Sequence, residues 1–411
     1  MKKQQSILKS TLQVSIFLFI TKILGVAKQS IIATVCGANA ETDAYFVATG
    51  VIIALCTVVF SSIAIPLLSI HTDRLVKEGR ESSNQLINIA LRLILPMSLI
   101  IALVFASCSS IIAKLLAPSY QGAQLQTLSL YIRMMSAMFV LICYSSIINV
   151  ILETDKKFLP EKQQGFLQNL FVCIAALFFY RTFGMKALIA SFLLAGFAQC
   201  INVTWHARHE LKLLRHVQID QQVYMQLVTL ALPLLVGNAI YEINDIVDKQ
   251  IATGLGSGNV SFLAYGASVN EIVTTLIISS ISTVLFSHYA TWIAEGKTEK
   301  VSDSLLKAID TLIVVIMPVM VMCLICGDYI VTILFGRGNF GQAAVIATAG
   351  VVTGYALGFI FQAFRATCVR VYFAFKDSKT PMLYGLISVS ANILLSLTLS
   401  RFMGVKGIAV A

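Results

Sequence analysis

Charged side chains are rare within the long apolar stretches of this sequence, and those that occur there define the chemistry it can perform. Two lysines, Lys22 and Lys28, lie in the first apolar stretch. A charge at membrane depth is costly, so each such residue is a candidate functional residue. Lys22 lies near the middle of the stretch and is expected to face a polar cavity. Lys28 lies near the end of the stretch, so its side chain could either face a cavity or extend to the membrane–water interface.

Acidic residues are concentrated in an apolar stretch of the second half of the chain. Glu242, Asp245 and Lys249 are spaced i, i+3 and i+7, which places them on one helix face. Asp245 and Lys249 form a favourable i,i+4 pair, but Asp248 and Glu242 remain as surplus acids. Acids here and lysines in the first stretch predict a working cavity between the two halves.

Two further carboxylates lie close to or within apolar stretches. Asp43 follows Thr42 at the expected start of a helix, so N-terminal capping and a role in a gate are both open. Glu271 lies more than two turns inside its helix with no cation nearby in sequence. We expect Glu271 to have a functional rather than a structural role.

The elements that must position these residues are membrane-spanning helices. Of the 411 residues, 57% are hydrophobic and 12% charged, and mean hydropathy is +0.84. Soluble domains carry about twice that share of charge. Apolar runs long enough to cross a bilayer as helices recur throughout, without the period-two alternation of a barrel. They lie at about 8–35, 44–70, 87–112, 126–152, 164–182, 184–206, 224–254, 259–291, 304–332, 342–372 and 382–400, and a twelfth begins at Gly404.

Lysine and arginine gather in alternate loops, which accounts for the net charge of +10 without nucleic acid. This bias predicts a multi-pass membrane protein with a cytoplasmic N-terminus. The first apolar run follows a basic start but lacks a cleavage site, so it is predicted to be the first spanning helix.

An internal repeat divides the chain. Ile32–Gly37 aligns with Ile251–Gly256 at an offset of 219 residues, and Arg181–Lys186 aligns with Arg401–Lys406 at an offset of 220. Six helices per repeat give the halves the same orientation, as in a parallel repeat. We predict an all-α polytopic membrane protein with an N-terminal lobe over 1–207, a cytoplasmic amphipathic linker over 208–222 and a C-terminal lobe over 223–411, helix twelve being largely missing from this chain.

Enzyme motifs do not account for this sequence. No nucleophile-elbow, HExxH or Walker pattern lies in a plausible loop, and Gly254–Gly258 predicts a tight turn between two helices. Cys323 and Cys326 have CxxC spacing but lie in a membrane helix without a second pair. The chain is expected to be neither an enzyme nor a metal-binding protein.

Four stretches together resemble the MurJ (MviN) lipid II flippases of the multidrug/oligosaccharidyl-lipid/polysaccharide exporter superfamily. The last reads Tyr-Phe-Ala-Phe-Lys-Asp-Ser-Lys-Thr-Pro and is similar to a loop of that family. The stretches are Lys22–Gly25 with Thr42–Ala48; Leu116–Tyr120 with Tyr131–Met135; Asp248, Ala252–Gly256, Tyr265 and Glu271; and Tyr372–Pro381.

The resemblance implies two six-helix lobes in a V shape around a cationic cavity that opens alternately to each side. It implies a cargo of lipid II, the undecaprenyl-pyrophosphate-linked peptidoglycan precursor of cell-wall synthesis. Lys22 and Lys28 stand at family arginine positions and would bind the pyrophosphate. Asp43 and Glu271 would form contacts between lobes. Two further family arginines fall near Cys56 or Thr57 and on Ser268, so this cavity carries less positive charge.

The same resemblance implies ion coupling rather than a cofactor. Asp245 or Asp248, with Asn392 from a later helix and Glu242 nearby, would bind Na+ or respond to the membrane potential. The expected partners are a polyprenyl-pyrophosphate-linked glycan and the lipid bilayer, with no nucleic acid, and the protein is expected to be a monomer.

Three other functions are compatible with the sequence. An O-antigen or capsule repeat-unit flippase would use the same mechanism on a different sugar. A cation-coupled multidrug antiporter would need an acidic, aromatic cavity, which the lysines of the first helix argue against. A membrane scaffold would not depend on Lys22 or Glu271 at all.

Overall fold

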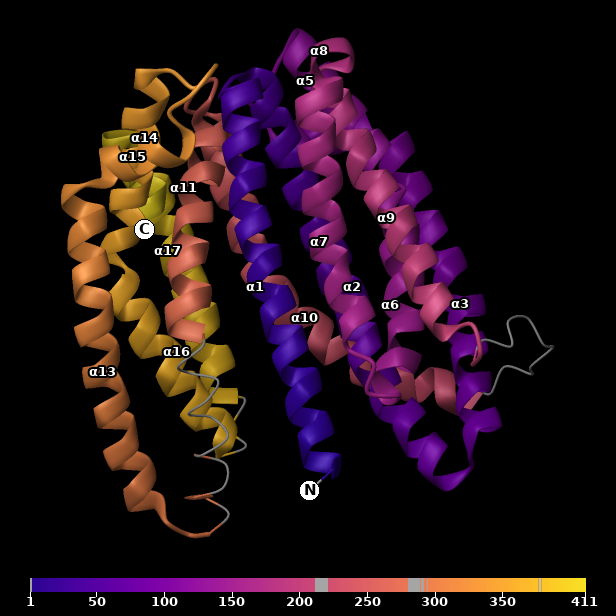
Figure 1. Ribbon diagram of the computed structural model, residues 1–411. Coiled ribbons are helices and arrows are strands. Elements are labelled where there is room, and N and C mark those ends of the chain that lie inside the picture. Colours follow the sequence, from indigo (N-terminus) through magenta and orange to yellow (C-terminus); the bar gives the residue numbers. More distant parts are fainter. Residues whose placement is uncertain are drawn as a thin grey trace. The chain divides into compact units, whose positions relative to one another are not determined.

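The computed structural model describes residues 2–210, 221–279, 289, 292–293, 295–375, 377 and 379–411. Over these residues the chain is helical and contains no strand, which confirms the predicted all-α class (Figure 1). The helices are α1 Lys2–Cys36, α2 Ala40–Lys77, α3 Arg80–Ser107, α4 Ser109–Leu116, α5 Gly122–Met135, α6 Met138–Thr154, α7 Leu159–Ile174, the π-helical η1 Ala175–Phe179, α8 Tyr180–Phe183, α9 Met185–Ala207, α10 Gln221–Thr253, α11 Asn259–Val273, the π-helical η2 Thr274–Ser279, α13 Thr298–Ile325, α14 Gly327–Phe335, α15 Gln342–Leu357, α16 Phe359–Ala374, α17 Lys379–Met403 and α18 Val405–Val410.

Many of these helices are long and apolar enough to cross a membrane. Within the described ranges ten qualify, or eleven if α15 and α16, bent by 44° at their junction, form one span. A polytopic membrane protein was predicted, and this count confirms it. The short α18 occupies the start of the predicted twelfth stretch.

The backbone repeats its irregularities in both halves of the chain. Cys108 ends α3 with φ −91°, and Cys326 ends α13 with φ −108°. Gly184 precedes α9 with φ 60°, and Gly404 precedes α18 with the same value. A positive φ of this kind suits glycine, which lacks a Cβ. Corresponding breaks at corresponding positions agree with the predicted internal repeat.

Two of these breaks were not expected from hydropathy. The predicted apolar runs 87–112 and 304–332 each continue through a cysteine and a short polar neighbourhood, Ser109 after Cys108 and Asp328 after Cys326, yet the helix ends there and a second helix begins. A small apolar residue does not mark a helix end in a hydropathy pattern, because the pattern records polarity and not backbone direction.

The described chain divides into two compact units. Unit 1 comprises residues 1–36 and 40–242, and unit 2 comprises residues 37–39 and 243–411. Most of the predicted linker, 208–222, lies outside the described residues. The predicted domain boundaries at 207 and 223 therefore stay predictions.

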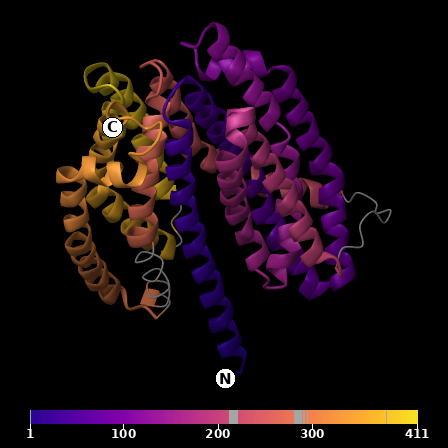
Figure 2. The same ribbon diagram turned by 45° about the horizontal axis from the view of Figure 1, so that its top comes forward.

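Unit 1 is built around α6, which packs against α2, α3 and α9. On one flank of the unit α7 packs against both α1 and α9, and Figures 1 and 2 show these helices side by side. Gly196 of α9 brings that helix close to Met138 and Leu141 of α6, since a Cβ at Gly196 would lie 3.2 Å from the Met138 sulfur. Small residues permit such close helix packing in a bilayer.

Unit 2 is built around α15, which packs against α11, α13, α14 and α18. Tyr265 of α11 is fully buried, and its ring lies 5.3 Å from the rings of Phe335 and Phe340. Its hydroxyl donates a hydrogen bond of 3.0 Å to the carbonyl of Gly37, which belongs to the same unit. A buried Tyr needs such a partner for its hydroxyl.

Gly266→Ala is expected to destabilise unit 2 by about 1–3 kcal/mol, the usual range for overpacking. The new Cβ would lie 2.9 Å from the Cβ of Val351 on α15. Gly237→Ala in α10 is the matched control, because nothing lies within 4 Å of its added Cβ. Thermal unfolding of the purified variants checks this. An equal midpoint for both variants would contradict the close packing of α11 on α15.

A charged network fastens the ends of α3, α6 and α9 in unit 1. Arg80 binds Asp155 through two parallel hydrogen bonds of 2.6 and 2.7 Å and donates a third, of 2.8 Å, to Glu210. Bidentate guanidinium–carboxylate pairs are strong and directional. The Arg80 guanidinium also holds the pKa of the Glu210 carboxyl below its ordinary value. The loop that follows α6 is therefore held in one position.

This network is expected to make unit 1 sensitive to acid. The pKa of Glu210 in the folded state lies below its unfolded value of about 4.3. The contribution of Glu210 to the free energy of unfolding is therefore complete above the unfolded pKa and is lost as pH falls through the folded-state pKa. Glu210→Gln should lower the unfolding midpoint at pH 7 and reduce its decline between pH 5 and 3. The exposed Glu299→Gln is the control. A wild-type midpoint independent of pH over this window would refute the role of the network.

Candidate functional site

A polar cavity of about 570 Å³ lies inside unit 1, between α1, α2, α6 and α7. Lys22 lines it from α1. The predicted working cavity between the two halves, and the role of Lys22 in it, stay predictions. The polar residues that line it with Lys22 are Thr21, Thr57, Ser61, Ser146, Asn149, Glu153, Glu161, Lys162, Gln164 and Gln168.

The position of Lys22 follows from close contact between α1 and α7. Asn169 of α7 donates a hydrogen bond of 3.2 Å to the carbonyl of Thr21. A Cβ at Gly165 would lie 3.3 Å from the Thr21 side chain, and one at Gly25 would lie 3.3 Å from Asn169. Because glycine lets the backbones of α1 and α7 approach each other, Lys22, which follows Thr21, is held close to the polar beginning of α7.

The charges around this cavity are of both signs. Glu161 and Lys162 form an ion pair with a distance of 2.8 Å between Oε1 and Nζ. Lys22 and Glu153 enter from α1 and α6, and amide side chains from α6 and α7 lie among them. A lysine ammonium binds phosphate as a point charge, and amides bind hydroxyl and peptide groups. The cavity therefore offers an ammonium, carboxylates and amide groups to a ligand.

Two positions predicted from family resemblance fall within this same cavity. Cys56 and Thr57, where a family arginine was expected, line it together with Lys22. Lys28 lies on the same helix, about 9 Å further along its axis and about 120° round it. It is partly buried, and the structure does not test its predicted role.

Asp43 and Glu271 occupy contrasting environments within their own units. Asp43 lies in the first turn of α2, and both it and Thr42 are fully buried. Glu271 lies on α11, exposed, three residues before the π-helical η2. π-Helical segments often occur at functional sites. Their predicted contacts between lobes stay predictions.

A cluster of oxygen-bearing side chains joins α10 and α17 in unit 2. Ser396 donates a hydrogen bond of 2.8 Å to Oδ1 of Asp248 and lies 3.4 Å from Oδ1 of Asn392. Asn244 donates to the other carboxylate oxygen at 3.4 Å. The structure thus brings together Asp248 and Asn392, which the sequence analysis paired across about 140 residues. A carboxylate, an amide oxygen and a hydroxyl are the ligands that hard cations prefer.

The other acids of α10 are arranged differently. Asp245 accepts a hydrogen bond of 2.5 Å from Lys249, which confirms the predicted i,i+4 pair. Glu242 belongs to unit 1 in the division of the chain, and its predicted role in ion binding is not tested. Within the described residues no group of three or more His, Cys, Asp or Glu side chains is arranged to hold a metal ion.

Most of the residues around Lys22 were not predicted from the sequence. The fifth apolar stretch was predicted to begin at residue 164, but α7 begins at Leu159. Proline at the start of this helix marks such an early N-terminus. Glu161, Gln164 and Gln168 are spaced i, i+3 and i+7, and this pattern would have predicted a polar face on α7.

Comparison with known proteins gives one consistent family. The family model described as "Lipid II flippase MurJ" matches residues 32–411. The probable lipid II flippase MurJ of Treponema pallidum is 26% identical over 425 residues, covering 100% of this chain and 79% of that protein. Among solved structures, a lipid II flippase MurJ in an inward closed conformation has a TM-score of 0.86 at 20% identity, covering 97% of this chain and 84% of that one. An inward-facing multidrug resistance MATE family transporter of the MOP superfamily has a TM-score of 0.79 at 13% identity, covering 98% and 93%.

Proposed function

Because this chain belongs to the MurJ family, we propose that it is a lipid II flippase that moves the undecaprenyl-pyrophosphate-linked peptidoglycan precursor across the cytoplasmic membrane by alternating access. The observation that carries the proposal is the polar cavity of unit 1, with Lys22 on its wall. A cation and amide side chains at membrane depth suit a cargo whose pyrophosphate and sugars must cross an apolar medium. The family match favours neither a capsule-unit flippase nor a multidrug antiporter.

Lys22 and Lys28 are the residues that we assign to the pyrophosphate. Lysine attracts phosphate without the bidentate geometry of arginine, so amide side chains near Lys22 supply the directional hydrogen bonds. Gln164 and Gln168 line the cavity together with Lys22 and suit this purpose. The protein only has to bind and reorient its cargo, so no catalytic residue is assigned.

Asp43 and Glu271 are assigned to contacts that change as the cavity opens to one side or the other. The Asp248 cluster, with Asn392 and neighbouring Asp245 and Glu242, is assigned to coupling. A cation bound there would add charge that responds to the membrane potential, worth about 2.3 kcal/mol per charge per 100 mV. That is enough to bias a carrier with two states of similar energy. In this proposal the N-terminus is cytoplasmic and the working unit is a monomer.

The experiment that tests this function is flipping of labelled lipid II in vesicles containing the purified protein. Loss of the label to a membrane-impermeant reagent should proceed faster than in protein-free vesicles. A polyprenyl-pyrophosphate carrying a capsule-type sugar is the control cargo and should flip more slowly. Rescue of a strain depleted of its own lipid II flippase is the test in cells. Faster flipping of the control cargo, with no rescue, would refute the assignment.

A further inference from the structure

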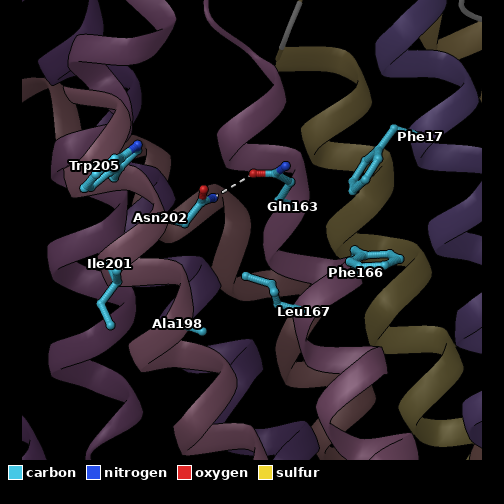
Figure 3. A pocket seen from close by; sticks show the side chains of 8 residues that line it. All are labelled: Phe17, Gln163, Phe166, Leu167, Ala198, Ile201, Asn202 and Trp205. Atoms are coloured by element: carbon cyan, nitrogen blue, oxygen red, sulfur yellow. Dashed lines mark hydrogen bonds between the residues drawn. The ribbon is translucent and has the colours of Figure 1, made fainter. Parts of the chain in front are cut away.

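An apolar groove of about 360 Å³ lies in unit 1 between α1, α7 and α9. Figure 3 shows Phe17 and Phe166 on one side and Trp205 and Ile201 on the other. Across the groove Asn202 donates a hydrogen bond of 2.8 Å to Gln163, so these two amides satisfy each other. The remaining wall is hydrocarbon, which suits an acyl chain.

One end of this groove lies at the expected height of the membrane–water interface. Trp205 is 63% exposed, and the guanidinium carbon of Arg208 lies 4.1 Å from its ring centroid. Tryptophans gather at this interface because one end of the ring is apolar and the other polar. An arginine over the ring face adds a favourable cation–π contact.

A second, basic pocket of about 240 Å³ lies close to the groove, because the two are lined by neighbouring residues of α1, α7 and α9. Gln13 lines it one turn before Phe17 on α1, and His206 lines it immediately after Trp205 on α9. Lys156 and Lys157 line it from the loop between α6 and α7. An apolar groove with a cationic mouth fits a molecule that has an anionic head and a hydrocarbon chain.

The loop that carries the two lysines is held in an unusual conformation. Lys156 has φ 61° and is the one non-glycine residue with positive φ among those the structure describes. Such strain often occurs at functional sites. Asp155, the preceding residue, is already bound through both carboxylate oxygens by Arg80, and the Lys157 ammonium lies 3.9 Å from it. Arg80, Lys156 and Lys157 together exceed Asp155 and Glu210 by one positive charge, so the loop can attract an anionic ligand.

We propose that this groove and its basic mouth form a binding site for a phospholipid with an anionic headgroup, taken from the leaflet on the side of the N-terminus. The phosphate lies between Lys156 and Lys157, and one acyl chain lies against Phe17, Phe166 and Trp205. Phe158 and Leu159, 43% and 37% exposed, extend the apolar surface of the loop. Basic pockets of this kind bind anionic headgroups, and each lysine near the surface strengthens binding roughly fivefold. The site does not depend on which lipid the protein carries.

The sequence offers a direct reporter for this site. It contains two tryptophans, so Trp292→Phe leaves Trp205 as the single fluorescent indole. In bilayers containing phosphatidylglycerol with brominated acyl chains, Trp205 should be quenched at much lower mole fractions than with brominated phosphatidylcholine. Lys156→Ala with Lys157→Ala should shift the phosphatidylglycerol midpoint upward by roughly 25-fold. Lys297→Ala with Lys300→Ala, which removes two exposed lysines of unit 2, should not shift it.

A second variant separates occupation of the groove from attraction of lipid to the surface. Ala198 lines the groove (Figure 3), and Ala198→Phe would fill it with a ring. Quenching of Trp205 by both brominated lipids should then fall. The phosphatidylglycerol midpoint of Lys156→Ala with Lys157→Ala should still differ from that of its control, Lys297→Ala with Lys300→Ala. Equal quenching by the two lipids in the Trp292→Phe protein, or unchanged quenching after Ala198→Phe, would overturn the proposal. Displacement of brominated phosphatidylglycerol by equimolar lipid II would also overturn it, because the site would then belong to the cargo.

Discussion

Lys22→Ala is expected to slow lipid II flipping at least tenfold and to abolish rescue of a flippase-depleted strain. Lys22 lines the polar cavity of unit 1, where it is the cation contributed by α1. Losing one charged hydrogen bond to the pyrophosphate costs about 1.5–3 kcal/mol. This corresponds to a roughly 10- to 150-fold weaker interaction. The vesicle assay with labelled lipid II measures the effect directly.

Two controls show whether the effect comes from charge inside the cavity. Lys22→Arg keeps the charge and adds a bidentate donor, so flipping should be retained. Lys114→Ala removes an exposed lysine of α4 in the same unit, and flipping should be unchanged. Wild-type flipping by Lys22→Ala, with normal expression, would contradict the role assigned to this lysine.

Asp248→Asn is expected to abolish the dependence of flipping on a cation gradient. The substituted amide can still accept the hydrogen bond from Ser396, so the contact between α10 and α17 is retained. The negative charge that would hold a cation is lost. Removing one partner of a buried charge pair costs about 3–5 kcal/mol, which implies cation binding weaker by roughly a hundredfold or more.

The measurement is lipid II flipping under three conditions: an imposed Na+ gradient, an imposed membrane potential, and neither. Comparing them separates coupling to Na+ from coupling to the membrane potential. Asp303→Asn is the matched control, because it neutralises an exposed aspartate of α13 in the same unit that is assigned to no site. It should keep the gradient dependence. If Asp248→Asn responds to the gradient as the wild type does, the cluster is a structural contact between two helices and not a coupling site.

Some of the residues that matter could be found by sequence reasoning and others could not. The pair Asp245–Lys249 was predicted correctly because i,i+4 neighbours meet on any helix. Lys22 was predicted to face a polar cavity because a cation in an apolar stretch needs polar surroundings. Glu153 and Gln168 were missed as its neighbours. They lie about 130 and 145 residues further along the chain, and no local pattern records which helices pack together.

By itself, the sequence determined the membrane class, the internal repeat and the isolated charges, since each depends on polarity and spacing within a single helix. Only the tertiary structure decided that α1 and α7 approach through Gly25 and Gly165, which positions Lys22 beside amide side chains. It also decided that Ser396 binds Asp248, and that the lysines after α6 lie at the mouth of an apolar groove. These arrangements depend on packing between distant helices, where close contact between small residues sets which side chains meet.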